Sequence, residues 1–173
     1  MYSLFLLFQY IGIVVLFGEL CYVFYQKPSR QQVCMLLLII SLMVNFVGYL
    51  LELQSVTMGQ AIMAVKVAYM GKPFIILLIF MFIMEYCGIK LPDWFYKILT
   101  ALHLTVTMCV MTCNHQKLYY SSINFTKEGF FPHLVLGHGP LYIIYHTTVV
   151  VYLIAMAAAC IYKYRNIKFI SLN

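Results

Sequence analysis

Charged side chains are scarce in this sequence. Aspartate, glutamate, lysine and arginine make up 9% of its 173 residues, and only five residues are acidic. Hydrophobic residues make up 64%, and the mean hydropathy is +0.92. A water-soluble domain of this size has too little interior to bury so much apolar surface. The composition therefore excludes a soluble protein and predicts an integral membrane protein.

The motifs of enzymes and metal sites are also missing. The sequence has no CxxC pair, no Cys/His spacing typical of zinc, no nucleophile and base pair and no cofactor-binding loop. We therefore expect no enzymatic activity, no cofactor and no bound metal. The net charge of +6 forms no basic patch interleaved with aromatics on a soluble face, so we expect no nucleic-acid partner.

Five apolar stretches are each long enough to cross a hydrocarbon core of about 30 Å, which takes roughly 20 helical residues. They cover residues 3–25, 33–53, 61–87, 96–113 and 140–163. Solid apolar runs favour helices over the ten-residue alternation of a membrane barrel. The sequence thus predicts an all-α fold, a polytopic membrane bundle of five transmembrane helices that forms a single domain over residues 1–173.

The basic residues at the ends of these stretches and between them are unevenly distributed. Two of them, Lys117 and Lys127, lie between the fourth and fifth stretches. The others follow the first stretch, the third stretch or the fifth: Lys27, Arg30, Lys90, Lys97, Lys163, Arg165 and Lys168. Because cytoplasmic loops are enriched in lysine and arginine, the N-terminus is predicted outside and the C-terminus in the cytoplasm.

Two lysines, Lys66 and Lys72, interrupt the third apolar stretch. An ionisable side chain inside the membrane indicates a functional site by default, because it is costly to hold there without a partner. Pro73 has no N–H to donate to the carbonyl of Tyr69. The helix is therefore expected to kink there and to leave that oxygen free beside Lys72.

The second stretch places Asn45, Tyr49 and Glu52 on one helical face, which should look into the bundle. At a rise of about 1.5 Å per residue, Asn45 is level with Lys72, and Glu52 is level with Lys66. We expect Lys72 to bind Asn45, Tyr49 or the freed carbonyl. Glu52 and Lys66 could form a buried ion pair that fixes the helix register, or they could contact a ligand, and both alternatives stay open.

Histidines gather in the segment 114–139 and at the start of the fifth stretch. The segment is the only long loop that the sequence predicts, and loops of this length are usually functional. His146 lies one turn after Tyr142, at about the depth of Lys66, so it is a candidate site residue. His103, in the fourth stretch, is expected to be a hydrogen-bonded packing residue.

A metal site built from histidines of this region is a further alternative, because imidazole is the commonest metal ligand. The histidines are His115, His133, His138 and His146. Glu128 is the only acidic residue that the loop adds to them. We therefore expect no metal here, and we assign His115 to a ligand-binding role instead.

Several ordered segments of the chain resemble a known family. They are residues 48–53 (GYLLEL), 68–74 (AYMGKPF), 91–94 (LPDW), 115–120 (HQKLYY) and 131–142 (FPHLVLGHGPLY). Their order and spacing resemble the N-terminal seven-transmembrane region that precedes histidine kinase, diguanylate cyclase and related output domains in bacteria. The resemblance implies an outer N-terminus, a sensory bundle and a cytoplasmic kinase or cyclase output domain. The given sequence departs from the pattern because it holds five helices, without helices 6 and 7 or an output domain, and it is open whether it is a fragment, a truncated reading frame or a free-standing relative.

We therefore interpret the chain as a signal-input module of the bacterial plasma membrane. It would be embedded in membrane lipid, with a pocket open to the outer side for a small-molecule ligand. The expected lining residues are Tyr49, Glu52, Lys66, Tyr69, Lys72, His115, Tyr142 and His146. A small transporter or channel subunit is the alternative, since transporters also hold substrate at broken helices with midplane charges. The oligomeric state stays open, with a homodimer among the alternatives.

Cysteine labelling tests the predicted orientation directly. In a cysteine-free background, a thiol at Lys127→Cys should react with a membrane-impermeant maleimide in intact cells, because the loop lies outside. A thiol at Lys27→Cys should react only after the cells are opened. The reverse pattern would show that the orientation is wrong.

Overall fold

Five long helices dominate the computed structural model, which describes residues 2–27, 29–127 and 132–170. They are α1 (Tyr2–Phe24), α2 (Arg30–Leu53), α3 (Met58–Cys87), α4 (Asp93–Met111) and α5 (Pro140–Ile170). Each helix is long and apolar enough to cross a membrane. The five predicted helices are confirmed, and each begins within three residues of its predicted start.

Side-chain caps explain where α2 and α3 begin. Ser29 accepts a hydrogen bond from the backbone of Gln32, and the Gln32 side chain accepts one from the backbone of Ser29. Thr57 and Gln60 form the same reciprocal pair at the start of α3. Such a capping box satisfies two N–H groups that a helix start otherwise leaves unpaired. These polar pairs therefore determine where the two short connections between the first three helices end.

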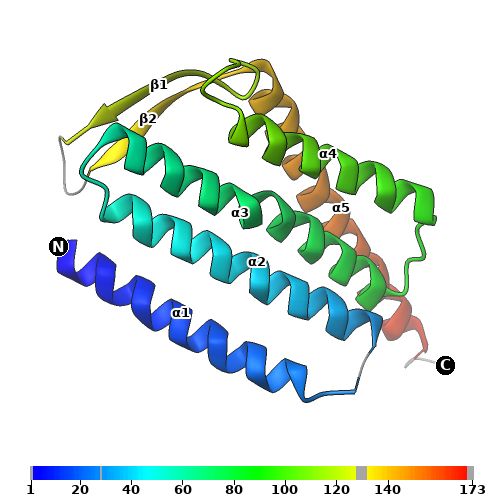
Figure 1. Cartoon of the computed structure of the whole chain (residues 1–173). Helices are drawn as coiled ribbons and strands as arrows, with labels where there is room; N and C mark the ends of the chain where they lie inside the picture. The colour runs from blue at the N-terminus through cyan, green and yellow to red at the C-terminus, as the bar shows by residue number, and fades with distance from the viewer. Residues whose placement is uncertain (1, 28, 128–131, 171–173) are drawn as a thin grey trace.

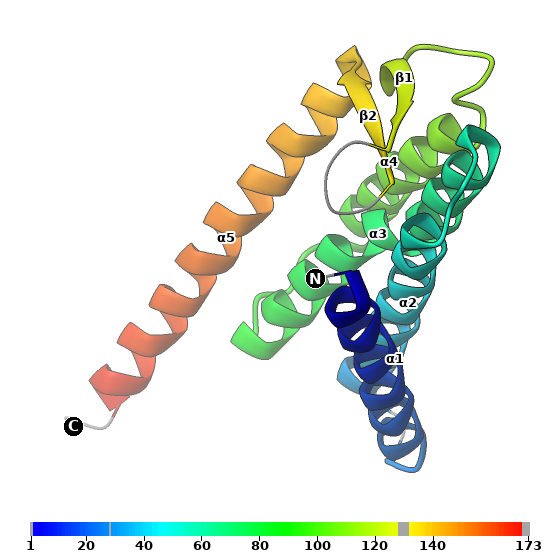
Figure 2. The same cartoon turned by 90° about the vertical axis from the view of Figure 1, so that its left-hand side faces the viewer.

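Helix α3 lies at the centre of the fold. Of its apolar span, 44% is buried, against 6% to 22% for the other four helices. In Figure 1, α1 to α4 lie side by side and α5 crosses behind α3 and α4. Figure 2 shows that α5 leans away from α1 and α2 toward its C-terminal end. Helix α3 is therefore the most buried of the five helices.

Two glycines allow α2 and α3 to pack in close contact. A Cβ atom at Gly48 would overlap the backbone of Ala68, and one at Gly71 would overlap the carbonyl of Ser41. Small residues at such crossings let the backbones of membrane helices approach each other. The contact fixes the rotation of α2 relative to α3.

The segment between α4 and α5 forms an antiparallel hairpin, not the loop that the sequence predicted. Its strands are β1 (Tyr120–Thr126) and β2 (His133–His138), with Tyr120 opposite His138 and Thr126 opposite His133. The fold is thus mostly helical, and the all-α prediction is corrected at this point.

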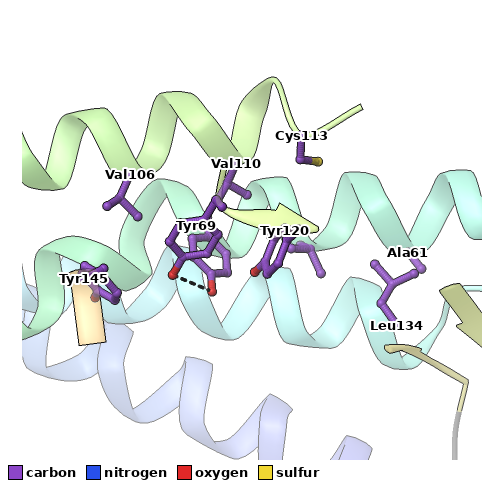
Figure 3. Packing of buried hydrophobic residues seen from close by; sticks show 10 residues of the cluster. Ala61, Tyr69, Val106, Val110, Cys113, Tyr120, Leu134 and Tyr145 are labelled. Carbon is purple, nitrogen blue, oxygen red and sulfur yellow. Dashed lines mark hydrogen bonds between the residues drawn. The ribbon is translucent and has the colours of Figure 1, made fainter. Parts of the chain in front are cut away.

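The hairpin covers a part of α3 that α4 does not reach. Thr107 of α4 contacts the carbonyl of Tyr69, and α4 ends four residues later, about 6 Å along the axis. From Tyr69, α3 extends about 16 Å in the same direction to Met58. Figure 3 shows Tyr120 and Leu134 of the hairpin beside α3. Extended strands can bury this surface because their side chains alternate between two faces.

His103 has the packing role that the sequence predicted. Its side chain is fully buried, and its Nε2 atom lies 3.1 Å from the hydroxyl of Tyr152 on α5. The ring is also in edge contact with Tyr145, at a centroid distance of 5.6 Å. This histidine therefore joins α4 to α5 inside the bundle.

The close contact between α2 and α3 predicts the effect of adding one methyl group. Gly48→Ala and Gly71→Ala should each lower the free energy of unfolding by about 1–3 kcal/mol, because the new carbon meets backbone atoms that cannot move aside. Gly18→Ala is the matched control, since nothing lies within 4 Å of the added carbon. Unfolding in detergent micelles measures all three. Equal stability of the Gly71 and Gly18 variants would contradict the described contact.

Candidate ligand-binding pocket

A pocket of about 210 Å³ lies where α2, α3, the hairpin and the start of α5 meet. Its walls combine one ammonium, one carboxylate, one imidazole, several phenol rings and apolar side chains. The lining residues are Tyr49, Glu52, Val65, Ala68, Tyr69, Lys72, Tyr120, Leu136, His138 and Tyr142. We refer to it as the Lys72 pocket.

The Lys72 ammonium is held by aromatic side chains. Its Nζ atom donates a hydrogen bond to the hydroxyl of Tyr49 at 3.3 Å. It also lies 5.0 Å from the centre of the Tyr69 ring and 5.7 Å from that of Tyr49. An aromatic face attracts a cation at such distances. The prediction that Lys72 has a partner inside the bundle is confirmed, and that partner is Tyr49.

The carbonyl of Tyr69 is not free beside Lys72, as the sequence had suggested. Thr107 of α4 donates a hydrogen bond to it at 3.3 Å. The same hydroxyl lies 3.1 Å from the carbonyl of His103. A threonine on a neighbouring helix can thus satisfy the oxygen that a proline leaves unpaired. This contact leaves the Lys72 ammonium to the aromatic rings.

Glu52 connects α2 to the hairpin. Its carboxylate accepts a hydrogen bond from the backbone N–H of Leu134 at 3.5 Å, and the side chain is partly buried. Within the described residues, no ion pair joins Glu52 to Lys66 or to Lys72. The ion-pair alternative for Glu52 and Lys66 therefore finds no support in the structure.

Buried phenols form part of the pocket wall and its support: Tyr69 and Tyr120 line the pocket, and Tyr119 contacts both of them. The hydroxyls of Tyr69 and Tyr119 lie 3.3 Å apart, and Figure 3 shows this bond between α3 and the hairpin. Tyr119 is fully buried and Tyr120 nearly so. Burial raises the pKa of both phenols well above the usual range, and the neighbouring Tyr69 adds to this rise. Both groups are therefore neutral hydrogen-bonding groups at physiological pH.

Three stacked rings join the hairpin to α5. The ring of Tyr142 stacks on His138 of β2 and on His146 of α5, with centroid distances of 3.9 Å on both sides. His146 Nδ1 lies 2.9 Å from the carbonyl of Tyr142, one turn earlier in the helix. The stack makes the first turn of α5 one wall of the pocket.

The structure brings together most of the residues that the sequence proposed for the site, but not all. The five that line the Lys72 pocket are Tyr49, Glu52, Tyr69, Lys72 and Tyr142. His146 lies behind Tyr142 and only supports that wall. A ligand-binding role for these residues stays a prediction.

Two of the proposed residues lie elsewhere. Lys66 lies near Cys113 beyond α4, where burial raises the pKa of the thiol and the lysine charge partly opposes this rise. His115 lines a separate cavity with Cys113 and Lys117. In the described parts of the chain, no three His, Cys, Asp or Glu side chains gather closely enough to hold a metal ion. Glu128 lies outside the described residues.

Sequence reasoning missed the hairpin residues Tyr120, Leu136 and His138 because it treated their segment as a loop. A signal was present in two short runs, 119–126, which is rich in aromatic and β-branched residues, and 133–136, which is apolar after its first residue, separated by residues that include Gly129 and Pro132. Such runs around a turn-forming segment predict a hairpin. The small residues Val65 and Ala68 gave no signal beyond that of an ordinary packed helix.

Comparison with known proteins gives one match. A family model described as the N-terminal 7TM region of histidine kinase matches residues 6–170. This range holds both strands, helices α2 to α5 and all but the first residues of α1. No curated protein and no solved structure matches the chain.

The buried phenol pair predicts how the hairpin is held to α3. Tyr119→Phe should lower the free energy of unfolding by about 1–3 kcal/mol, because the buried Tyr69 hydroxyl loses its partner. Replacing both tyrosines with phenylalanine should restore part of this loss, since no polar atom is then left unpaired. Tyr162→Phe, at an exposed position of α5, is the control. A double variant as unstable as the sum of the two single variants would contradict a direct bond.

Proposed function

The chain belongs to the family of N-terminal seven-transmembrane regions of histidine kinases, and from this premise we propose that it senses a small anion in the Lys72 pocket. In this proposal the chain is a membrane signal-input module, and its own activity is to bind and relay. The pocket supports the proposal because it joins four separate parts of the fold around the Lys72 ammonium, with the Glu52 carboxylate in the same lining.

The observation that carries the proposal is the state of the Lys72 ammonium. Its direct contacts are the hydroxyl of Tyr49 and the faces of two rings, so no carboxylate is bonded to it, although the charge of Glu52 attracts it from the same lining. Glu52 lines the same pocket and is bonded to the hairpin instead. A charge inside an apolar bundle is costly, and a bound anion would offset this cost.

The size of the pocket limits the ligand. A volume of about 210 Å³ would hold about seven water molecules, at roughly 30 Å³ each. Drug-sized ligands occupy pockets of about 300–1,000 Å³. A short carboxylate fits this space, with its oxygens at Lys72 and its carbon atoms against the tyrosine rings.

The distribution of charge supports an orientation with the hairpin outside. Lys27, Arg30, Lys90, Lys97 and Lys163 lie at or near the end of the bundle opposite the hairpin, which is then the cytoplasmic end. In a bacterial plasma membrane, the pocket would open to the outer side. The N-terminus would lie outside and the C-terminus in the cytoplasm.

A relay through α5 follows from where the pocket lies. Tyr142, in the first turn of α5, forms one wall, and Lys72 of α3 forms another. A ligand shifts a bundle only by binding two arrangements with different affinity. An anion that lies between Lys72 and Tyr142 would change how α5 sits on α3. The other end of α5 would pass this movement to a cytoplasmic kinase or cyclase domain.

Thermal unfolding with a panel of carboxylates tests the proposal. The purified protein in detergent micelles is heated with the sodium salts of formate, acetate, propionate, butyrate, pyruvate and lactate, against equal concentrations of NaCl. A ligand at 100 times its Kd adds about 2.7 kcal/mol of stability, which raises the Tm by several degrees. We expect at least one acid to stabilise the wild type, and Lys72→Gln to abolish the effect.

Lys66→Gln is the matched control, because this lysine is on the same helix but does not line the pocket. It should respond to the acid as the wild type does. If Lys66→Gln abolishes the response and Lys72→Gln keeps it, the anion binds elsewhere. If no acid stabilises the wild type, a carboxylate is not the ligand of this pocket.

A further inference from the structure

A second cavity, of about 640 Å³, lies at the end of the bundle opposite the hairpin. The first turns of α2, the last turns of α3 and the first turns of α4 form its walls. It shares no lining residue with the Lys72 pocket. We refer to it as the α2–α4 groove, and what it binds is independent of the function proposed above.

Each of the three helices turns one face toward this groove. The contributing residues are Arg30, Val33, Cys34 and Leu37 of α2, Leu78, Met81 and Glu85 of α3, and Asp93, Tyr96 and Lys97 of α4. Within each helix they are spaced by one, three or four residues, which places them on one side. The charged residues lie toward the helix ends and the apolar ones deeper in the bundle.

The groove therefore has a polar rim and an apolar floor. From Arg30 to Leu37 the chain descends seven residues along α2, about 10 Å. Val33 and Leu37 are exposed, so their apolar surface is available to whatever fills the groove. In a bilayer this depth corresponds to the step from headgroups to acyl chains.

The rim carries a balanced set of charges. Arg30 and Lys97 are cationic, and Glu85 and Asp93 are anionic. All four side chains are exposed. In the part of the chain that the structure describes, none of them makes a hydrogen bond or an ion pair. The four charges are thus available to a ligand. A ligand with one positive and one negative group would match them.

We propose that the α2–α4 groove binds one zwitterionic aminophospholipid, phosphatidylethanolamine. Its phosphate lies between Arg30 and Lys97, close to the first turns of α2 and α4, where the helix dipoles also favour an anion. Its ammonium lies against Glu85 and Asp93. The start of one acyl chain covers Val33 and the apolar floor below it.

The two carboxylates of the rim, Glu85 and Asp93, determine which class of lipid the groove prefers. An anionic phosphatidylglycerol would meet the two cations but also two carboxylates that repel it. A choline headgroup carries a positive charge but no N–H, whereas the ethanolamine ammonium has three N–H donors, as a lysine side chain does. Phosphatidylethanolamine is the one of these three that satisfies both pairs of charges.

Native mass spectrometry of the intact chain tests the proposal. The protein is purified in a mild detergent and incubated with equimolar phosphatidylethanolamine, phosphatidylcholine and phosphatidylglycerol of the same acyl composition. We expect one bound lipid, with phosphatidylethanolamine retained roughly fivefold over each competitor, the most that one exposed ion pair contributes.

Two double variants separate the roles of the charges. In E85Q/D93N, the preference for phosphatidylethanolamine should disappear, and phosphatidylglycerol should bind best because only the cations remain. In R30Q/K97Q, retention of all three lipids should fall. The controls are K90Q, a cation at the same end but outside the groove, and E19Q, a carboxylate that lines a different cavity. Both controls should match the wild type.

Several outcomes would overturn the proposal. They are equal retention of the three lipids by the wild type, a wild type that binds phosphatidylglycerol best, and an unchanged preference in E85Q/D93N. Circular dichroism and gel filtration check that each variant is folded. Should E85Q/D93N fail to fold, the single variants E85Q and D93N replace it, and each is expected to show an intermediate preference.

Discussion

The close contact between α2 and α3 is the constraint on which the site depends. Glycine at positions 48 and 71 lets the two backbones touch, and this sets the rotation of both helices. With that rotation fixed, Tyr49 of α2 lies within hydrogen-bonding distance of Lys72 of α3. Glu52, one turn beyond Tyr49, is then close enough to bond the backbone of β2. The crossing of α2 and α3, which apolar residues form, thus determines where the polar groups of the pocket lie.

A neighbouring helix replaces the backbone hydrogen bond that Pro73 removes from α3. The missing N–H leaves the Tyr69 carbonyl without its helical partner, and Thr107 of α4 supplies the hydrogen bond instead. Since both the backbone and the phenol of Tyr69 are bonded to other elements, this residue joins α3 to α4 and to the hairpin. A ligand that moves the Tyr69 ring would act on all three.

The two cavities differ in how their charges are arranged. In the Lys72 pocket, the ammonium faces phenol rings and the carboxylate is bonded to the hairpin. In the α2–α4 groove, two cations and two carboxylates share one rim above an apolar floor. The Lys72 pocket thus holds one cation and one carboxylate that are bonded to different elements, whereas the α2–α4 groove holds two of each on one rim.

The sequence by itself determined the five helices and singled out Lys72. Long apolar runs can satisfy their backbone only as helices in a membrane, and a lysine among them needs a partner. It could not determine the hairpin, because short strands become favourable only where their alternating side chains find a surface, here the part of α3 that α4 leaves uncovered. It also could not separate Lys66 from Lys72. Both lie in the same apolar stretch, and only the packing of α2 and α4 against opposite sides of α3 decided which lysine faces the pocket.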